Sequence, residues 1–350
     1  MAHYTDKRVK RGGAAYAGYN TVFRRHSIAP GAPPDSMRHH LIRAAARGIL
    51  AMLLGLAPAV AYAAAAGDAV QWWVWPLSLF CVCFVLGVIA VPAGVGGGVL
   101  FVPIVSGFFP FHLDFVRGAG LLVALASALA AGPGLLRAGL ADLRLGLPLA
   151  LAASTSAIAG ALIGLALPPA LVQTTLGVTV LGISVLMWRS KKSEFPLVDK
   201  PDVLSAALRI NGIFYDFGLK RDVNWQVHRT PLGLVLFTLI GVLAGVFGLG
   251  AGWANVPVLN LVMGVPLRLS VGTSGFILAI VDSAAAWVYI NKGALLAVIA
   301  APSVIGMMLG AFVGARLLRV LPAIILRKLV ITILLLAGTR ALAKGLGVWV

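Results

Sequence analysis

The residues best suited to chemistry in this chain form two glycine-rich breaks in apolar segments. The first reads GVGGGVLFVP from Gly94 to Pro103, and the second reads GLGAGWANVP from Gly248 to Pro257, 154 positions later. Glycine adopts backbone angles that other residues avoid, so each break is expected to interrupt a helix. A helix that restarts after the break presents free N–H groups and the positive end of its dipole, which attract anions.

Two such helix starts that converge from opposite sides predict an anion-binding site. The candidate residues in the breaks are Gly96, Gly97, Gly98, Gly250, Gly252 and Asn255. The amide of Asn255 lies in an otherwise apolar stretch, where it needs a partner such as a substrate oxygen or a neighbouring helix. Alternatively, the glycines only allow helices to pack closely. We favour binding, because the break recurs and each copy is followed by a proline.

Two hydroxyl groups are further candidates for the same site. The offset between the breaks aligns GAG at 118–120 with GTS at 272–274. Thr273 and Ser274 are therefore candidate hydrogen-bond donors to the anion. Hydroxyls in membrane helices also bond to the carbonyls of their own helix, which is the alternative reading.

Asp282 is the most unusual single residue, because it is an acidic residue deep inside an apolar segment. A carboxylate there is costly and indicates function by default. We interpret Asp282 as a candidate proton carrier that couples transport to a pH gradient, with a structural hydrogen-bonding role as the alternative. The matching position of the first break's unit is Ala128, so either role is one-sided.

The sequence contains no pattern typical of an enzyme, a metal site or an organic cofactor. Cys81 and Cys83 are the only cysteines, and at this spacing they face different sides of a helix. His112 and His228 have no companions at ligand or triad spacing, and no Walker, Rossmann or zinc-protease motif is present. We therefore expect no catalytic residue, no metal and no cofactor.

Composition indicates that the lipid bilayer is the chain's main partner. Hydrophobic residues make up 60% and charged residues 11% of the 350 residues, whereas soluble domains carry about 25% charged residues. The net charge of +17 comes from basic residues in the amino-terminal arm and in loops beside apolar segments. The positive-inside rule predicts that placement, so we expect no nucleic-acid partner.

The elements that must position the candidate residues are two sets of apolar segments, which predict membrane repeats at 76–188 and 231–345. The segments cover about 77–109, 117–133, 146–166 and 170–188, then about 231–264, 271–290, 294–315 and 323–339. The leading segment of each set is too long for one crossing, since about 33 helical residues extend roughly 50 Å against a hydrocarbon core of about 30 Å. Each break should split it into a crossing and a shorter or re-entrant piece. The expected fold is all-α and polytopic, with five passes in each of two inverted repeats.

Charge predicts which side each connection faces. Arg137, Arg144 and the polar linker at 189–230, which is rich in Lys and Arg, fall on the cytoplasmic side. Two positive residues, Arg117 and Lys292, fall on the external side and run against the rule.

The amino-terminal region has two parts. Residues 1–36 form a basic, polar arm that we expect to be disordered. Residues 37–66 are either a signal-peptide-like segment that begins at Met37 or an uncleaved first membrane helix.

These motifs give the chain a family resemblance. AGVGGGVLFVP with RGAG in the first half, and FGLGAGWANVP with VGTS in the second, resemble the TauE/SafE family of sulfite and organosulfonate exporters, also called the four-toluene-sulfonate uptake permease family. The resemblance spans about 76–345. It implies an integral membrane carrier of small, often sulfur-containing anions without an organic cofactor. The long linker and the signal-like start depart from the family pattern, which leaves the substrate open.

We therefore predict a multi-pass secondary transporter of the cell inner membrane that moves a small anionic solute by alternating access. A channel-like anion conduit is the first alternative, because it would share the positive helix ends but need no coupling residue. A membrane scaffold or sensor that signals through the 189–230 linker is the second.

Overall fold

A computed structural model describes most of the chain from residue 73 onward. The described residues are 73–93, 96–137, 139–189, 196, 198, 200–216, 221–250, 252–317 and 323–348. The predicted arm at 1–36 and the signal-like segment at 37–66 lie outside these residues.

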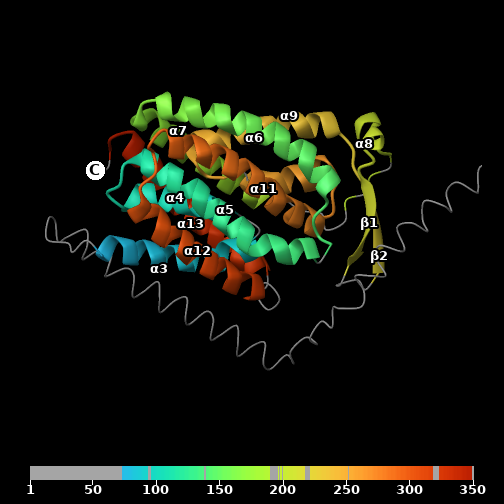
Figure 1. Cartoon of the computed structure of the whole chain (residues 1–350), viewed down its shortest axis with the longest axis horizontal. Coiled ribbons are helices and arrows are strands. Elements are labelled where there is room, and N and C mark those ends of the chain that lie inside the picture. The colour runs from blue at the N-terminus through green and yellow to red at the C-terminus, as the bar shows by residue number, and fades with distance from the viewer. Residues whose placement is uncertain are drawn as a thin grey trace, which may run out of the picture. The chain divides into compact units, whose positions relative to one another are not determined.

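Helices dominate the described residues (Figure 1). The first half contains α3 (Val74–Ala93), α4 (Gly97–Phe108), α5 (Leu113–Arg137), α6 (Leu143–Ala166) and α7 (Pro169–Arg189). The second half contains α9 (Thr230–Phe247), α10 (Gly252–Pro257), the π-helical turn η2 (Val258–Val262), α11 (Leu267–Asn291), α12 (Ala297–Leu317) and α13 (Ala323–Gly345). Of these, α5, α6, α7, α9, α11 and α12 are each long and apolar enough to cross a membrane. The predicted all-α, polytopic membrane fold is confirmed.

Both leading segments break where the glycines predict. In the first half α3 ends at Ala93 and α4 begins at Gly97, and in the second half α9 ends at Phe247 and α10 begins at Gly252. Helix α4 has 12 residues, which extend about 18 Å and cannot cross a core of about 30 Å. Helix α10 has six residues and continues into the five-residue turn η2 after Pro257. Both restarted pieces are therefore short.

Glycine contacts fix the relative directions of neighbouring helices. Helix α3 packs on α12 and α6 packs on α9. Phe80 lies against Gly306 and Phe84 against Gly310, so α3 and α12 run parallel. These are close backbone contacts of the kind that small residues allow in membrane bundles.

The linker has secondary structure of its own. It contains the short helix α8 (Val203–Ala207) and a two-stranded antiparallel hairpin, β1 (Asn211–Asp216) and β2 (Arg221–Gln226). Trp225 of β2 is buried in the core cluster that also holds residues of α6 and α11. The backbone N–H of His228 donates to the carbonyl of Met263 at 3.2 Å, which anchors the linker just after η2.

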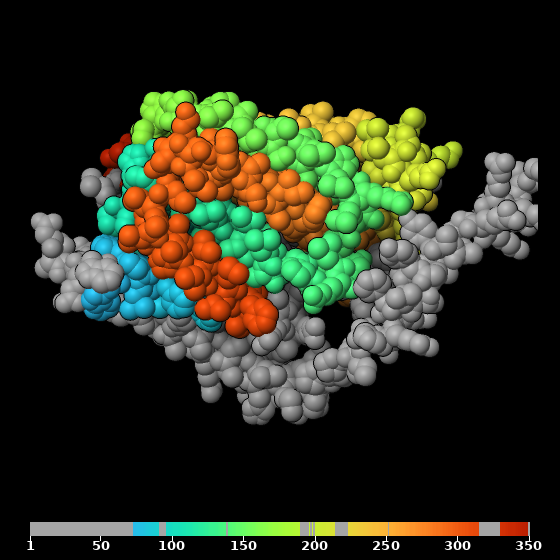
Figure 2. Space-filling view, in the orientation of Figure 1, coloured from blue at the N-terminus to red at the C-terminus, as the bar shows by residue number. Residues whose placement is uncertain are grey.

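The described linker residues gather at one end of the helices. Figures 1 and 2 show them beside the connection between α5 and α6. We call this the linker end. The opposite end, where α5 begins and α6 and α11 finish, is called the far end.

Candidate functional site

The first glycine break ends one helix and starts the next without a side-chain cap. Gly96 is the N-cap residue of α4, and its backbone is extended, with φ −62° and ψ 143°. Because it is a glycine, it has no side chain that could accept a hydrogen bond from the N–H groups of the first turn. The second break turns more sharply, because Gly248 and Gly250 have φ values of +65° and +72°. Those left-handed angles are open to glycine and strained for other residues.

The two breaks touch each other. A methyl group placed on Gly252 would lie 2.8 Å from the backbone nitrogen of Gly96, and one on Gly98 would lie 2.6 Å from the carbonyl oxygen of Leu249. Neither neighbour is a flexible side-chain end, so only glycine allows the approach. The start of α4 and the start of α10 are therefore adjacent, although they lie about 150 residues apart in the sequence.

Helices α5 and α11 cross the breaks and hold them together. Leu278 of α11 contacts both Gly96 and Gly252, with its Cδ1 3.6 Å and 3.0 Å from methyl positions on the two glycines. A methyl on Gly120 of α5 would lie 2.6 Å from the carbonyl oxygen of Gly248. Each break is thus packed between its own half and a helix of the other half.

Ser127 is a polar neighbour of the first break that sequence reasoning missed. Its hydroxyl oxygen accepts from the Gly97 N–H at 3.3 Å and donates to the Ala124 carbonyl at 2.8 Å. One free donor at the start of α4 is thereby satisfied. The position 154 residues later is Val281, next to Asp282, so comparison of the two halves could have drawn attention to it.

Asp282 lies directly beside the second break. Its two carboxylate oxygens lie 3.1 Å and 3.3 Å from a methyl position on Gly250, and the side chain is fully buried. Neither oxygen has a hydrogen-bond partner among the described residues. A buried carboxyl without partners is costly, so it requires a further explanation.

Asn255 shares this property. It lies three residues into α10 from Gly252, it is fully buried, and neither its amide nitrogen nor its amide oxygen has a partner within the described part of the chain. Its amide retains two donors and an acceptor for a ligand.

The predicted hydroxyls have different surroundings. The hydroxyl oxygen of Thr273 accepts from the Asp142 backbone N–H at 3.1 Å, so it ties α11 to the start of α6 at the linker end. Asp142 in turn caps α6 by accepting from the Leu145 N–H at 2.8 Å. Ser274 is buried on the same helix. The structure therefore brings Asp282 and the glycines together, whereas Thr273 serves a connection between helices.

Arg117, which the sequence predicts to lie on the external side as an exception to the charge rule, is buried. Its guanidinium donates to the Val246 carbonyl at 2.9 Å and to the Gly164 carbonyl at 3.1 Å, and it pairs with Asp114. It also lies 5.7 Å from the ring centre of Tyr289. The carbonyls belong to the last turns of α6 and α9, where a cation complements the helix dipole. Arg117 thus ties four helices toward the far end, and its backbone contacts the second break at Gly248.

Two other cations satisfy the last turn of α4. Arg340 donates to the Gly107 carbonyl at 2.7 Å, and Lys344 donates to the Ser106 carbonyl at 2.9 Å. Helix α4 is therefore fixed at its end by α13, while its start remains in the glycine contact.

The described residues offer no metal site, since they contain no cluster of three His, Cys, Asp or Glu side chains that could hold an ion. What the breaks offer is backbone donors, one free amide and one carboxyl that changes from acceptor to donor when it binds a proton. Such a set is suited to an anion and a proton rather than to a covalent reaction.

A family model described as sulfite exporter TauE/SafE matches residues 79–341. The match runs from within α3 to within α13, and it includes both breaks, Asp282 and the linker. Neither a curated protein nor a solved structure matches the chain. Because the family match covers most of the sequence and all of the candidate site, the chain belongs to the TauE/SafE family of membrane transporters.

Proposed function

We propose that this protein is a secondary transporter of the plasma membrane that carries a small sulfur-containing anion, such as sulfite or a sulfonate, by alternating access. One observation carries the proposal: the two helix starts meet at Gly96 and Gly252, beside the buried and unpartnered carboxyl of Asp282. Discontinuous helices that meet in the interior are how many secondary transporters build a substrate site.

The anion would be bound by donors rather than by a fixed cation. The start of α4 supplies backbone N–H groups, of which that of Gly97 donates to Ser127 and that of Val99 to the Gly96 carbonyl, so the N–H of Gly98 is the donor proposed for the anion. The free amide of Asn255 supplies side-chain donors from the other break. Backbone and amide donors bind an oxyanion without the strong hold of a salt bridge, so release remains easy.

Asp282 would couple this binding to protons. An ionised carboxylate beside the breaks repels an anion, whereas a protonated carboxyl is neutral and donates a hydrogen bond. Anion and proton would therefore bind together more readily than either alone. That linkage is the requirement for a proton-coupled carrier.

Repeated contacts support two halves with inverted topology. Two close contacts between a glycine of one half and a carbonyl of the other have a counterpart in which the halves are exchanged. The contact of Gly87 with the Met307 carbonyl corresponds to that of Gly241 with the Ala153 carbonyl, because each residue is shifted by 154 positions into the other half. In the same way, the contact of Gly118 with the Ala294 carbonyl corresponds to that of Gly272 with the Leu140 carbonyl. An exchange of the halves by a two-fold axis would produce this pattern.

The directions of the corresponding helices α5 and α11 support inversion as well. Near the far end, the start of α5 at Gly118 packs on Tyr289 at the end of α11. Deeper in the bundle, Ala124 of α5 and Asp282 of α11 both contact Gly250. The two helices therefore run antiparallel, as equivalent helices of inverted repeats must.

The decisive test is solute exchange by the purified full-length protein in liposomes. Radiolabelled sulfite should enter faster when unlabelled sulfite is present inside, because a carrier returns more quickly when loaded. Taurine, sulfoacetate, sulfate and acetate as competitors would define the substrate class. Flux without acceleration by internal solute would favour an anion channel, and no flux of any of these anions would overturn the proposal.

A further inference from the structure

Four described cations lie at the far end of the bundle, which the charge rule predicts to be external. Three of them have structural partners: Arg117, Arg340 and Lys344 donate to backbone carbonyls at helix ends. The fourth, Lys292, is the exposed C-cap residue of α11, and its ammonium group makes no hydrogen bond or ion pair with any described residue. Its charge complements the dipole at the end of α11, but, unlike the other three, it is bonded to no carbonyl of the described residues, so it remains available to a ligand.

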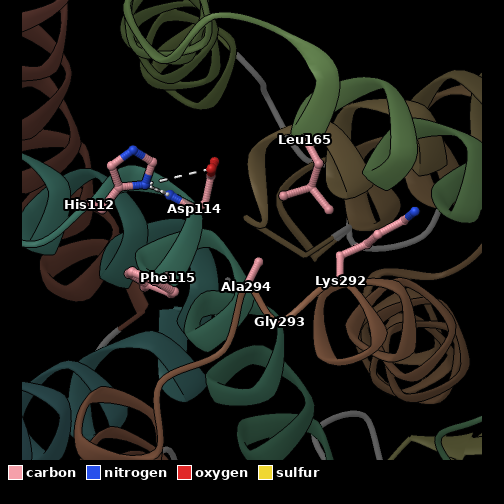
Figure 3. A pocket seen from close by; sticks show the side chains of 7 residues that line it. All are labelled: His112, Asp114, Phe115, Leu165, Lys292, Gly293 and Ala294. Carbon is pink, nitrogen blue, oxygen red and sulfur yellow. Dashed lines mark hydrogen bonds and ion pairs between the residues drawn. The ribbon is translucent and has the colours of Figure 1, made fainter.

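Lys292 lines a cavity at this end. The cavity has a volume of about 570 Å³. Figure 3 shows His112 and Asp114 on one side and Leu165 and Lys292 on the other, with Gly293 and Ala294 between them. The wall thus combines an ammonium group, an imidazole and a carboxylate with apolar surface, which is typical of a site for a small polar solute.

The buried guanidinium of Arg117 forms part of the surroundings of this cavity. Arg117 pairs with Asp114, which lines the cavity, and donates to the carbonyl of Gly164, the residue before the lining residue Leu165. The charge of Asp114 is therefore already balanced. Lys292 remains as a net positive charge at the rim, so the cavity attracts anions from solution.

Two continuous helices, α5 and α11, connect the cavity at the far end with the glycine breaks deeper in the bundle. On α5, Asp114 precedes Ala124, which contacts Gly250, by ten residues or about 15 Å. On α11, Asp282 precedes Lys292 by ten positions. Arg117 lies between the cavity and the second break. A methyl on Gly248, the first residue of that break, would overlap the backbone of Arg117.

We propose that this cavity is a second anion site, a vestibule in which a small oxyanion is held by Lys292 before it passes to the glycine breaks or after it leaves them. The vestibule rests on the proposed transport function for its role, but its charge and its ability to bind are measurable without transport. Its ligand is a small oxyanion such as a sulfonate or sulfite, because the single ammonium group of Lys292 pairs with one anionic group and the cavity is large enough to admit it.

The first test measures the local charge. Leu165→Cys places a thiol in the cavity wall, and the wild-type chain, with Cys81 and Cys83 only, sets the background. We measure the ratio of the rate constants for the anionic reagent iodoacetate and the neutral reagent iodoacetamide. This ratio should be higher for the thiol in the cavity than for free mercaptoethanol. Lys292→Gln should lower this relative preference by about threefold to tenfold at low ionic strength, and added salt should reduce it as well. Lys200→Gln, at the linker end, is the matched control and should leave the ratio unchanged. An unchanged ratio in Lys292→Gln overturns the proposal.

The second test measures binding. Methanesulfonate should slow alkylation of Leu165→Cys by iodoacetamide relative to sodium chloride of equal ionic strength, and Lys292→Gln should abolish the protection. If methanesulfonate gives no protection to Leu165→Cys while Lys292 is still present, the oxyanion site is overturned.

In liposomes, Lys292→Gln should raise the KM for sulfite severalfold and leave kcat near the wild-type value. If the wild-type chain carries no sulfite, the proposed function fails, whereas the alkylation results still decide the vestibule.

Discussion

At the scale of single residues, the proposed coupling rests on Asp282. It is fully buried, contacts the second break at Gly250, and has no hydrogen-bond partner among the residues that the structure describes. A structural carboxyl normally has such partners. The geometry is therefore better explained by a group whose partner is a mobile proton or a transported anion.

Asp282→Asn tests this role, because asparagine keeps the shape and hydrogen-bonding capacity of the acid but cannot ionise. If Asp282 carries the coupling proton, uptake or export driven by a pH gradient should collapse, while sulfite exchange without a gradient should persist. Both fluxes are measured in the same liposomes. Ser283→Ala is the control, since the exposed Ser283 hydroxyl bonds only to the Ala279 carbonyl of its own helix.

A structural role for Asp282 gives a different pattern. Asparagine would then be tolerated in both assays, and Asp282→Ala would lower the free energy of unfolding by about 1–3 kcal/mol for one lost buried interaction. Normal gradient-driven transport by the Asn variant would end the coupling hypothesis.

Arg117 makes a second residue-scale prediction, which concerns stability. Arg117→Ala leaves Asp114 without the guanidinium, removes the side-chain donor of the Gly164 carbonyl, and leaves the Val246 carbonyl with only the longer bond from the Tyr289 hydroxyl at 3.4 Å. We expect a loss of about 3–5 kcal/mol, the usual effect of removing one partner of a buried ion pair. Thermal unfolding in detergent measures it. Lys292→Gln, at the same end but without partners, should unfold at the wild-type temperature, and equal melting of the two variants would contradict the assignment.

At the scale of elements, the restarted helices depend on glycine for their mutual contact. Both α4 and α10 are short, and each begins against the other break. The two ends of α4 differ: α13 fixes its last turn through Arg340 and Lys344, whereas its start is held by one hydrogen bond to Ser127 and by packing against the other break. The contact at Gly96 and Gly252 is therefore the point at which a small steric change should have a large effect.

Gly252→Ala introduces a methyl group 2.8 Å from the Gly96 backbone nitrogen. This overpacking should cost about 1–3 kcal/mol of stability and abolish sulfite exchange. Gly182→Ala in α7 is the matched control, since no heavy atom lies within 4 Å of a methyl there. The control should keep full exchange and gain slightly in stability from the higher helix propensity of alanine. Retained exchange in Gly252→Ala would show that the breaks do not form the site.

At the scale of the whole molecule, charge and packing agree on one polarity. Apart from Arg117, Lys292, Arg340 and Lys344 at the far end, the described Arg and Lys residues belong to the linker or to helix ends on its side, and Lys292 is the far-end cation whose side chain bonds to no described residue. The positive-inside rule therefore predicts that the linker end faces the cytoplasm.

Thiol labelling in intact cells tests this orientation. Ile213→Cys, on the exposed face of β1, should resist an impermeant maleimide until the cells are permeabilised. Pro169→Cys, at the start of α7 on the opposite side, should react at once. The wild-type chain gives the background of its two cysteines. External labelling of Ile213→Cys would reverse the proposed topology.

Much of the architecture could be predicted because its causes are local. Apolar runs of membrane length set the helices, and glycine clusters end them within a few residues of Ala93 and Phe247. The linker was less predictable. Its hairpin places Trp225 in the core cluster, and the sequence of a polar segment does not indicate which distant surface will accept one aromatic ring.

The sequence by itself determined that this is a membrane protein of the TauE/SafE type with two recurring helix breaks, because hydrophobicity and helix interruption are properties of neighbouring residues. Only the tertiary structure decided that Gly96 meets Gly252 and that the carboxyl of Asp282 is left without a partner beside them. It also decided that Arg117 is buried and bonded while Lys292 stays free at a cavity. These outcomes depend on how helices far apart in the chain pack together, and spacing along one chain does not record which backbone atoms finally come into contact.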